Sequence, residues 1–170
     1  NNAELEKLPG QTYMFKAVVE GKFPELSFPT DEVLELKKDA QVMFVKNDSS
    51  PEKRYYNGMI GRVTAINERG FVVQPKGTSE AIEVAPEEWE NNRYELDEQT
   101  KEIKEVREGL FRQYPIKTAW AITIHKSQGL TFSHAIIDAS LSFAHGQTYV
   151  ALSRCKTLEG LVLSAPIPAR

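Results

Sequence analysis

The chain of 170 residues contains a single cysteine, Cys155, and only three histidines. One cysteine excludes an intrachain disulfide framework and any zinc site built from several cysteines, and such scarcity is typical of a reducing compartment. No run approaches the roughly 18 consecutive apolar residues of a membrane span, and the first residues lack the profile of a signal peptide. We therefore expect a soluble, intracellular protein.

Several common signatures of a self-contained active site are also absent. The only Gly-Lys pair, at residues 21–22, is followed by Phe23 instead of Ser or Thr, so there is no phosphate-binding P-loop. There is no Gly-x-Ser-x-Gly elbow of a hydrolase. Cys155 lies on the apolar face of an expected helix, where a core residue is more common than a nucleophile. No Cys or acidic cluster accompanies the histidines, so we expect no metal site at His125, His134 and His145.

The charge balance excludes one class of nucleic-acid binder. The chain has 21 Lys plus Arg against 24 Asp plus Glu, a net charge of −3, which excludes histone-like or tail-type binding. Residues 119–170 nevertheless contain few carboxylates, so a polyanion would meet little repulsion there. With 41% hydrophobic and 26% charged residues, the chain is predicted to form one domain or two small ones.

The first two thirds of the sequence predict short strands separated by turns. Alternating and β-branched residues with Gly, Asn and Pro between them favour a barrel or a sandwich, with a hairpin turn at residues 67–70. The expected strands cover residues 11–20, 42–45, 59–66, 71–73 and 81–85. Residues 31–38 favour a short helical turn, and residues 97–112 fit either a solvated helix or an edge strand.

After Pro115 the pattern becomes that of an α/β domain. Apolar runs at residues 119–124, 135–138 and 161–163 predict buried parallel strands. Residues 146–155 have helical spacing that would turn Ala151 toward the sheet. The economical interpretation is a small β-barrel at residues 40–115 inserted between two parts of an α/β domain.

Two polar segments of this last part are candidates for chemistry. The loop at residues 123–129 follows an expected strand, which is where α/β sheets bind phosphates, but a polar connection that begins a helix fits it equally well. Arg154, near the end of an apolar helix, is either a surface side chain or one aimed at an anion.

These segments resemble known helicase motifs. Ala-Trp-Ala-Ile-Thr-Ile-His-Lys-Ser-Gln-Gly (119–129) and Gly-Gln-Thr-Tyr-Val-Ala-Leu-Ser-Arg (146–154) resemble the fifth and sixth motifs of superfamily-one, group B DNA helicases of the RecD-like and petite-integration-frequency type. Residues 40–48 and 56–61 resemble the entry into the Src-homology-type barrel of these enzymes. The resemblance implies a partial second RecA-like domain, residues 1–39 and 116–170, with the barrel inserted at 40–115.

The resemblance also implies roles for individual residues. The residues that match the grip on single-stranded DNA are Thr123, His125, Lys126 and Ser127. Those that match the nucleotide side of the cleft are Gln128, Gly129 and Thr131. Arg154 matches the catalytic arginine finger that reaches the γ-phosphate.

The implied protein is the C-terminal part of an ATP-dependent 5′ to 3′ DNA helicase from the cytoplasm of a bacterium, with roles in DNA repair and recombination. ATP and Mg²⁺ would be held mainly by an N-terminal RecA-like domain outside this sequence, and the fragment alone would not hydrolyse ATP. The expected partners are single-stranded DNA and that domain, with no membrane.

Two other classes of function remain open. The chain could be a stand-alone nucleic-acid-binding or protein-binding module, with Trp89, Tyr94 and Phe111 as a stacking platform, although these aromatic residues fit a barrel core better. A purely structural adaptor would leave both helicase-like segments unexplained.

Overall fold

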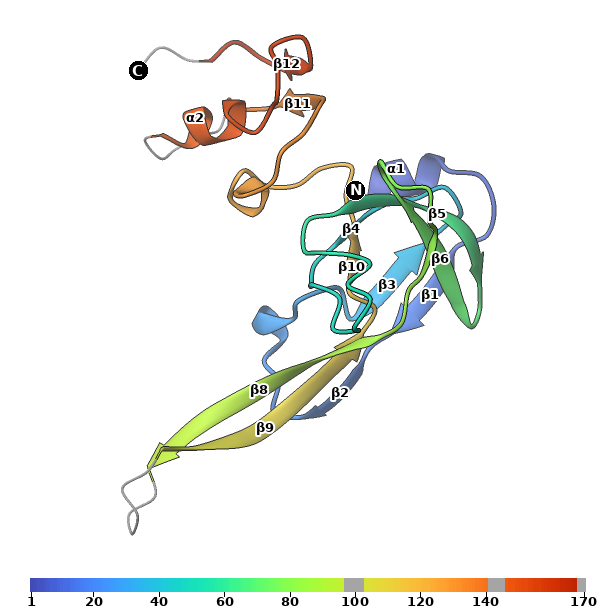
Figure 1. Ribbon diagram of the computed structural model, residues 1–170, viewed down its shortest axis with the longest axis vertical. Coiled ribbons are helices and arrows are strands. Elements are labelled where there is room, and N and C mark those ends of the chain that lie inside the picture. Colours follow the sequence, from blue (N-terminus) through green and yellow to red (C-terminus); the bar gives the residue numbers. More distant parts are fainter. Residues whose placement is uncertain (97–102, 141–145, 168–170) are drawn as a thin grey trace. The chain divides into compact units, whose positions relative to one another are not determined.

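Figure 1 shows the computed structural model, which describes residues 1–96, 103–140 and 146–167. The chain forms two compact units, Asn1–Trp120 and Ala121–Arg170. No described helix is long and apolar enough to cross a membrane.

The first unit consists almost entirely of strands. Its elements are α1 (Asn2–Lys7), β1 (Tyr13–Lys16), β2 (Val18–Gly21), η1 (Glu25–Ser27), β3 (Val33–Leu36), β4 (Gln41–Phe44), β5 (Ile60–Asn67), β6 (Gly70–Pro75), β7 (Ile82–Glu83), β8 (Glu87–Leu96), β9 (Ile103–Gln113) and β10 (Ile116–Thr118).

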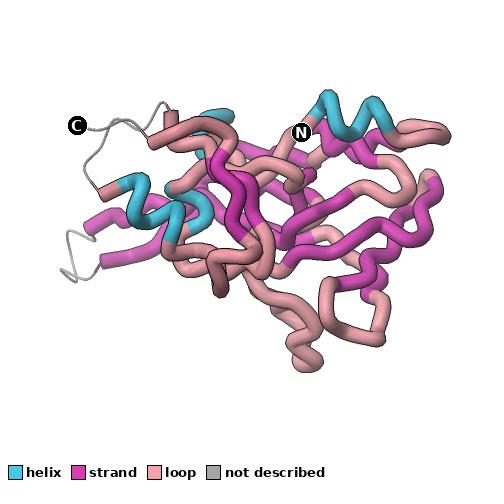
Figure 2. Tube along the Cα trace, turned by 90° about the horizontal axis from the view of Figure 1, so that it is seen from above, coloured by secondary structure: helices cyan, strands magenta, loops and turns pink. Residues whose placement is uncertain are grey.

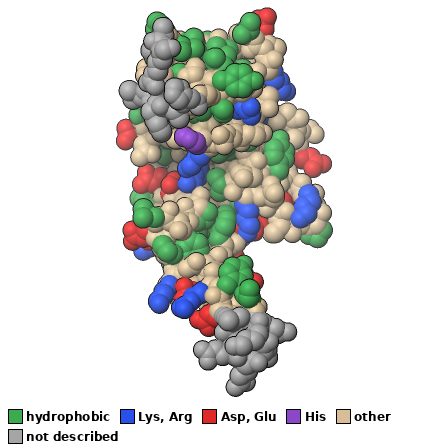
Figure 3. All heavy atoms as spheres, turned by 90° about the vertical axis from the view of Figure 1, so that its left-hand side faces the viewer, with side chains coloured by type: hydrophobic (Ala, Val, Ile, Leu, Met, Phe, Trp, Pro, Cys, Tyr) green, Lys and Arg blue, Asp and Glu red, His purple; other side chains and the backbone are tan. Residues whose placement is uncertain are grey.

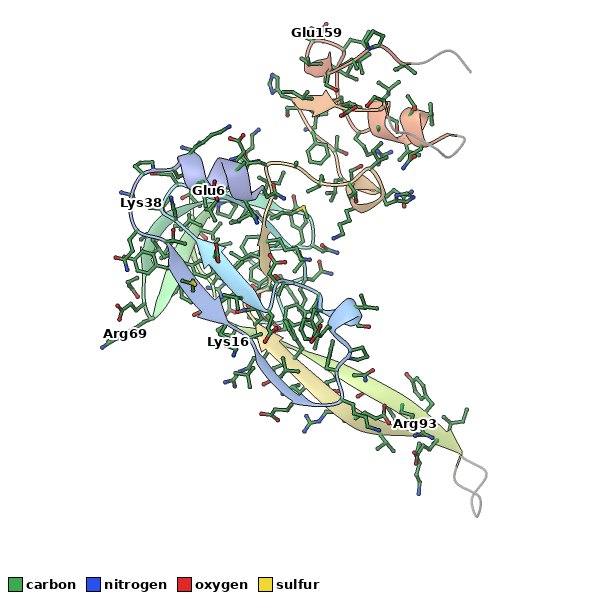
Figure 4. All side chains as sticks on the ribbon, turned by 180° about the vertical axis from the view of Figure 1, so that it is seen from behind. Glu6, Lys16, Lys38, Arg69, Arg93 and Glu159 are labelled. Carbon is green, nitrogen blue, oxygen red and sulfur yellow. The ribbon has the colours of Figure 1, made fainter. Side chains whose placement is uncertain are left out.

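The central element is a five-stranded antiparallel sheet in the order β10-β4-β5-β6-β7. Its inner side chains alternate along the strands, as in β6, where Phe71 and Val73 are buried between less buried neighbours. The predicted strands at 42–45, 59–66, 71–73 and 81–85 are confirmed in type, and Asn67 pairs with Gly70 in the predicted hairpin. Arg69 marks this turn in Figure 4.

The N-terminal residues differ from the expectation. The strand expected over residues 11–20 is divided at Ala17: β1 pairs with β3, whereas β2 pairs with β9. The helical turn expected at residues 31–38 is wrong, because Leu34 and Leu36 of β3 are buried and alternate with exposed neighbours, which is the period of a strand.

One hydrophobic core joins these strands to the central sheet. Phe15, Leu34 and Leu36 share it with Val42 and Phe44, so residues 1–39 pack with residues 40–115. Among the described residues the strands form a five-stranded sheet and a separate β1–β3 pair, not one closed sheet. The Src-homology-type barrel and the domain division therefore stay predictions.

A three-stranded ribbon, in the order β2-β9-β8, extends from this core (Figure 1). Residues 103–112, expected as a helix or an edge strand, belong to the central strand β9, and residues 97–102 lie outside the described residues. The sequence interpretation missed β8. Acidic and basic side chains are interspersed in the space-filling view (Figure 3), and the ribbon contains cross-strand ion pairs such as Arg107–Glu90.

An aromatic cluster lies at the base of the ribbon. Phe111 contacts Trp89, Phe23 and Phe28, with ring centroids 6.0, 5.6 and 4.6 Å away. Phe111 is completely buried, whereas Tyr94 is exposed farther along β8. The three residues suggested as a stacking platform therefore do not present one surface.

The second unit contains η2 (His125–Ser127), β11 (Ala135–Ile137), α2 (Gln147–Leu152) and β12 (Leu161–Leu163). β11 and β12 pair in parallel, which confirms two of the expected parallel strands and the mixed α/β class. α2, a cyan helix in Figure 2, packs Ala151 against Ile137 and Ala139, and Cys155 packs against the same cluster.

The third expected parallel strand, at residues 119–124, is wrong. β10 ends at Thr118 and runs antiparallel to β4, and the Ala119 N–H donates to the Gln41 carbonyl. An apolar run becomes a strand only where another strand takes up its backbone hydrogen bonds, and no described strand pairs with residues 120–124. The β11–β12 pair is also less buried than expected, since Ile136 and Val162 are 76% and 54% exposed and Ile137 is the one buried residue of these two strands.

Candidate functional site

The predicted DNA-binding residues lie together in one short turn, η2 and the two residues before it. The Lys126 N–H donates to Thr123 Oγ1 at 3.4 Å, and Ser127 Oγ donates to the Ile124 carbonyl at 2.7 Å. Ser127 is only 6% exposed. The hydroxyls of Thr123 and Ser127 therefore form hydrogen bonds within the turn.

The same turn leaves other polar groups at the surface. His125 and Lys126 are exposed on η2, and Gln128, Gly129 and Thr131 follow them, all exposed. Gly129 has a φ of +78°, in the left-handed region that a residue without a Cβ adopts most easily. Of the four predicted DNA-binding residues, Thr123, His125 and Lys126 are thus exposed, and only Ser127 is buried.

Arg154 lies just after α2 and is held against the loop that carries the predicted nucleotide-binding residues. Its Nε donates to the Val150 carbonyl at 3.1 Å and its Nη1 to the Leu130 carbonyl at 3.4 Å. Its Nη2 donates to Ser153 Oγ at 3.0 Å. The guanidinium therefore lies beside the carbonyl of Leu130, the residue between Gly129 and Thr131 in the sequence.

Backbone hydrogen bonds fix this contact between two segments that are far apart in sequence. The Phe132 N–H donates to the Arg154 carbonyl at 2.8 Å, and the Lys156 N–H donates to the Phe132 carbonyl at 3.0 Å. The Leu130 N–H also donates to the Ser127 carbonyl at 3.0 Å. The structure thus connects the η2 turn, the 128–131 loop and Arg154 within one unit.

The acceptors around Arg154 are all neutral. Among the described residues no carboxylate forms an ion pair with Arg154 or Lys126. Hydrogen bonds from the hydroxyl and backbone N–H of Ser140 hold the pKa of Asp138 below its ordinary value, and the backbone N–H of Glu159 with the Thr157 hydroxyl does the same for the pKa of Glu159. The guanidinium keeps a full positive charge that an anion could neutralise.

Two further groups near Arg154 were missed by the sequence interpretation. These are the Ser153 hydroxyl and the Leu130 carbonyl, both within hydrogen-bonding distance of the guanidinium. Ser153 precedes Arg154 within the motif-like segment, which was the available signal for it. In the part of the chain that the structure describes, no group of three or more His, Cys, Asp or Glu side chains is placed to hold a metal ion.

Comparisons with known proteins agree with the motif-like segments. No protein-family model matches the chain. The chain is 34% identical to the ATP-dependent DNA helicase Pif1 of Psychrobacter sp. (strain PRwf-1), over 96% of this chain and 31% of that protein. It is also 34% identical to the ATP-dependent DNA helicase PIF1 of Homo sapiens, over 95% of this chain and 24% of that protein. The chain thus spans less than a third of the length of these relatives.

Two solved structures of a Bacteroides Pif1 are similar to this chain. One, bound to single-stranded DNA, has a TM-score of 0.79 and 44% identity, and covers 98% of this chain and 38% of that one. The other, in complex with ADP-AlF4, has a TM-score of 0.81, 44% identity and the same coverage. Both relatives and the Bacteroides protein are Pif1 helicases, the type that the segments at 119–129 and 146–154 resemble.

Proposed function

The chain belongs to the Pif1 family of DNA helicases, and from this premise we propose that it supplies the single-strand grip and the arginine finger of an ATP-dependent 5′ to 3′ DNA helicase. One observation carries the proposal: Arg154 and the 128–131 loop are held together and connected to the η2 turn. In this proposal residues 1–39 and 116–170 belong to the second RecA-like domain, and residues 40–115 form the inserted barrel.

The grip on DNA is assigned to the exposed side chains of η2. Lys126 offers an ammonium and His125 an imidazole N–H, and both can donate to phosphate oxygens without reading the base sequence. The exposed Thr123 hydroxyl can donate to a phosphate oxygen as well, whereas the buried Ser127 acts indirectly, because its hydroxyl holds the turn that presents these side chains. The complex of the similar Bacteroides Pif1 with single-stranded DNA supports this choice of partner.

Arg154 is assigned to the nucleotide. A guanidinium spreads positive charge over the oxygens of a phosphoryl group in transfer, and a planar fork fits two of them. Gln128, Gly129 and Thr131 lie on the same loop as Leu130, whose carbonyl accepts from Arg154, and are the candidates for the remaining contacts. The complex of the similar Bacteroides Pif1 with ADP-AlF4 supports a nucleotide as the ligand.

ATP and Mg²⁺ are assigned mainly to the N-terminal RecA-like domain of the whole enzyme. This sequence has no P-loop, whose backbone N–H groups and Lys would cradle the phosphates. The 170-residue chain alone is therefore proposed to lack ATPase activity. Its partners are single-stranded DNA and that domain.

The test uses the full-length enzyme that contains this segment. Arg154→Ala should reduce DNA-stimulated ATP hydrolysis by about 10³- to 10⁵-fold, the range for arginine fingers, while single-stranded DNA binding measured by fluorescence anisotropy stays unchanged. The double variant His125→Ala with Lys126→Ala should have the opposite effect: it should weaken binding to single-stranded DNA more than it lowers ATP hydrolysis. If Arg154→Ala keeps hydrolysis within a few-fold of the parent, the arginine is not the finger.

A further inference from the structure

Ser153 forms the C-cap of α2 and stands next to Arg154. Its Oγ donates to the Val150 carbonyl at 2.9 Å and accepts a hydrogen bond from Arg154 Nη2 at 3.0 Å. A serine hydroxyl has one proton and two lone pairs. Because the proton is directed to Val150, a lone pair is turned toward the guanidinium, and one hydroxyl connects the helix end to the arginine.

The Arg154 side chain is held at three points. Nε contacts the Val150 carbonyl, Nη1 the Leu130 carbonyl and Nη2 the Ser153 hydroxyl. A guanidinium has five N–H groups, so these contacts with described residues use three of them and leave one N–H on Nη1 and one on Nη2. Two adjacent N–H groups on the terminal nitrogens are the pair that binds two phosphate oxygens at once.

We propose that Ser153 is a positioning residue that orders the Arg154 guanidinium, with its outer pair of N–H groups free, before the nucleotide arrives. The inference rests on the proposed function of Arg154 as the arginine finger. A long arginine side chain loses rotamer freedom when it is fixed. Where neutral acceptors of the protein already fix it, less of that loss has to occur as the phosphoryl group is transferred.

The Ser153 hydroxyl contributes more to the position of the Arg154 side chain than to the stability of the unit. Ser153 is exposed, and without its hydroxyl the Val150 carbonyl still accepts from Arg154 Nε. The backbone N–H of Ser153 keeps its bond to the Tyr149 carbonyl in any variant. Ser153→Ala should therefore fold like the parent protein.

The experiment uses the full-length enzyme with four variants: Ser153→Ala, Ser153→Thr, Arg154→Ala and, as a matched control, Ser133→Ala. Ser133 is also exposed and in the same unit, and its hydroxyl has no hydrogen-bond partner among the described residues. The measurements are kcat and KM of DNA-stimulated ATP hydrolysis, and the affinities for ADP and for ADP with aluminium fluoride.

Ser153→Ala should lower kcat by about tenfold, the size expected for one hydrogen bond to a charged group, and leave the KM for ATP unchanged. Its affinity for ADP with aluminium fluoride should fall by about the same factor while its affinity for ADP alone stays constant. Ser153→Thr keeps the hydroxyl and should restore the parent values, and Ser133→Ala should match the parent.

A double variant shows whether Ser153 acts through Arg154. If it does, Ser153→Ala should cause no further loss of affinity for ADP with aluminium fluoride in a protein that already carries Arg154→Ala. Parent-like kinetics of Ser153→Ala, beside a severe loss in Arg154→Ala, would overturn the role of Ser153 alone. A loss that Thr does not restore, or that adds to Arg154→Ala, would also overturn it. Parent-like hydrolysis by Arg154→Ala would overturn the finger assignment itself.

Discussion

Replacing Asp48 by Ala tests how the loop between β4 and β5 is held. The Asp48 carboxylate is only 3% exposed and accepts hydrogen bonds from the backbone N–H groups of Ser50 and Arg54, each at 2.9 Å. The Arg54 Nε lies 3.5 Å away. Removing the carboxylate leaves both N–H groups without this acceptor, while the backbone bond from the Asp48 N–H to the Tyr55 carbonyl remains.

The expected cost follows from these contacts. Each lost backbone hydrogen bond contributes about 1 kcal/mol, and the half-exposed Arg54 pair adds a few tenths, so Asp48→Ala should lower the free energy of unfolding by about 2–3 kcal/mol at pH 7. Both tryptophans, Trp89 and Trp120, lie in the first unit, so their fluorescence during urea denaturation follows this unit. Glu68→Ala, at the exposed turn between β5 and β6, is the control and should stay within about 0.5 kcal/mol.

The dependence on pH gives a second readout. Burial raises the pKa of Asp48, but the hydrogen bonds from Ser50 and Arg54 and the charge of Arg54 outweigh it and leave the pKa below its ordinary value. A lowered pKa means that the stabilisation is present above the ordinary pKa of 3.8 and is lost as the pH falls through the lower, folded value. The difference between the parent and Asp48→Ala should therefore shrink below about pH 4. An equal difference at pH 7 and pH 3, or a cost below about 0.5 kcal/mol, would refute the reasoning.

Three more outcomes are expected. Leu36→Ala, at a completely buried position, should lower the free energy of unfolding by about 2–5 kcal/mol in urea denaturation, whereas Leu26→Ala, at a fully exposed position, should change it by less than about 0.5 kcal/mol. The pure 170-residue chain should not hydrolyse ATP in a phosphate-release assay, and turnover with contaminating enzymes excluded would contradict this. Its binding to single-stranded DNA should be weak, with a salt dependence that corresponds to about one to three neutralised phosphates, and a steep dependence would place the contact surface elsewhere.

Four strands of the central sheet could be predicted from local signals, since β5 and β6 alternate buried and less buried residues and β4 is a run of buried apolar residues, whereas β10 was not predicted. The alternation in β6 and the Asn-Glu-Arg-Gly turn before it are local signals, and both agree with the structure. β8 has no such signal because ion pairs with β9, such as Arg112–Glu88 and Arg107–Glu90, join residues about 20 positions apart. A strand stabilised mainly by its neighbour cannot be recognised from its own ten residues.

Residues 119–124 show the opposite failure. Their composition is that of a buried strand, but β-structure also requires a neighbouring backbone that accepts and donates hydrogen bonds. The backbone of β10 pairs with β4, and this pairing ends near Ala119. Composition therefore identified an apolar segment correctly and assigned it the wrong conformation.

The candidate site was predictable as a set of residues but not as an arrangement. Arg154 and the 123–129 loop were found because their side-chain types match a motif, and side-chain types are what a sequence records. The groups that hold the guanidinium include the carbonyls of Val150 and Leu130, and every residue has a carbonyl. The parallel bridge between Phe132 and Cys155 brings Leu130 beside Arg154. A substitution that disturbs this bridge should therefore impair the positioning of the Arg154 guanidinium without altering any residue of the motif.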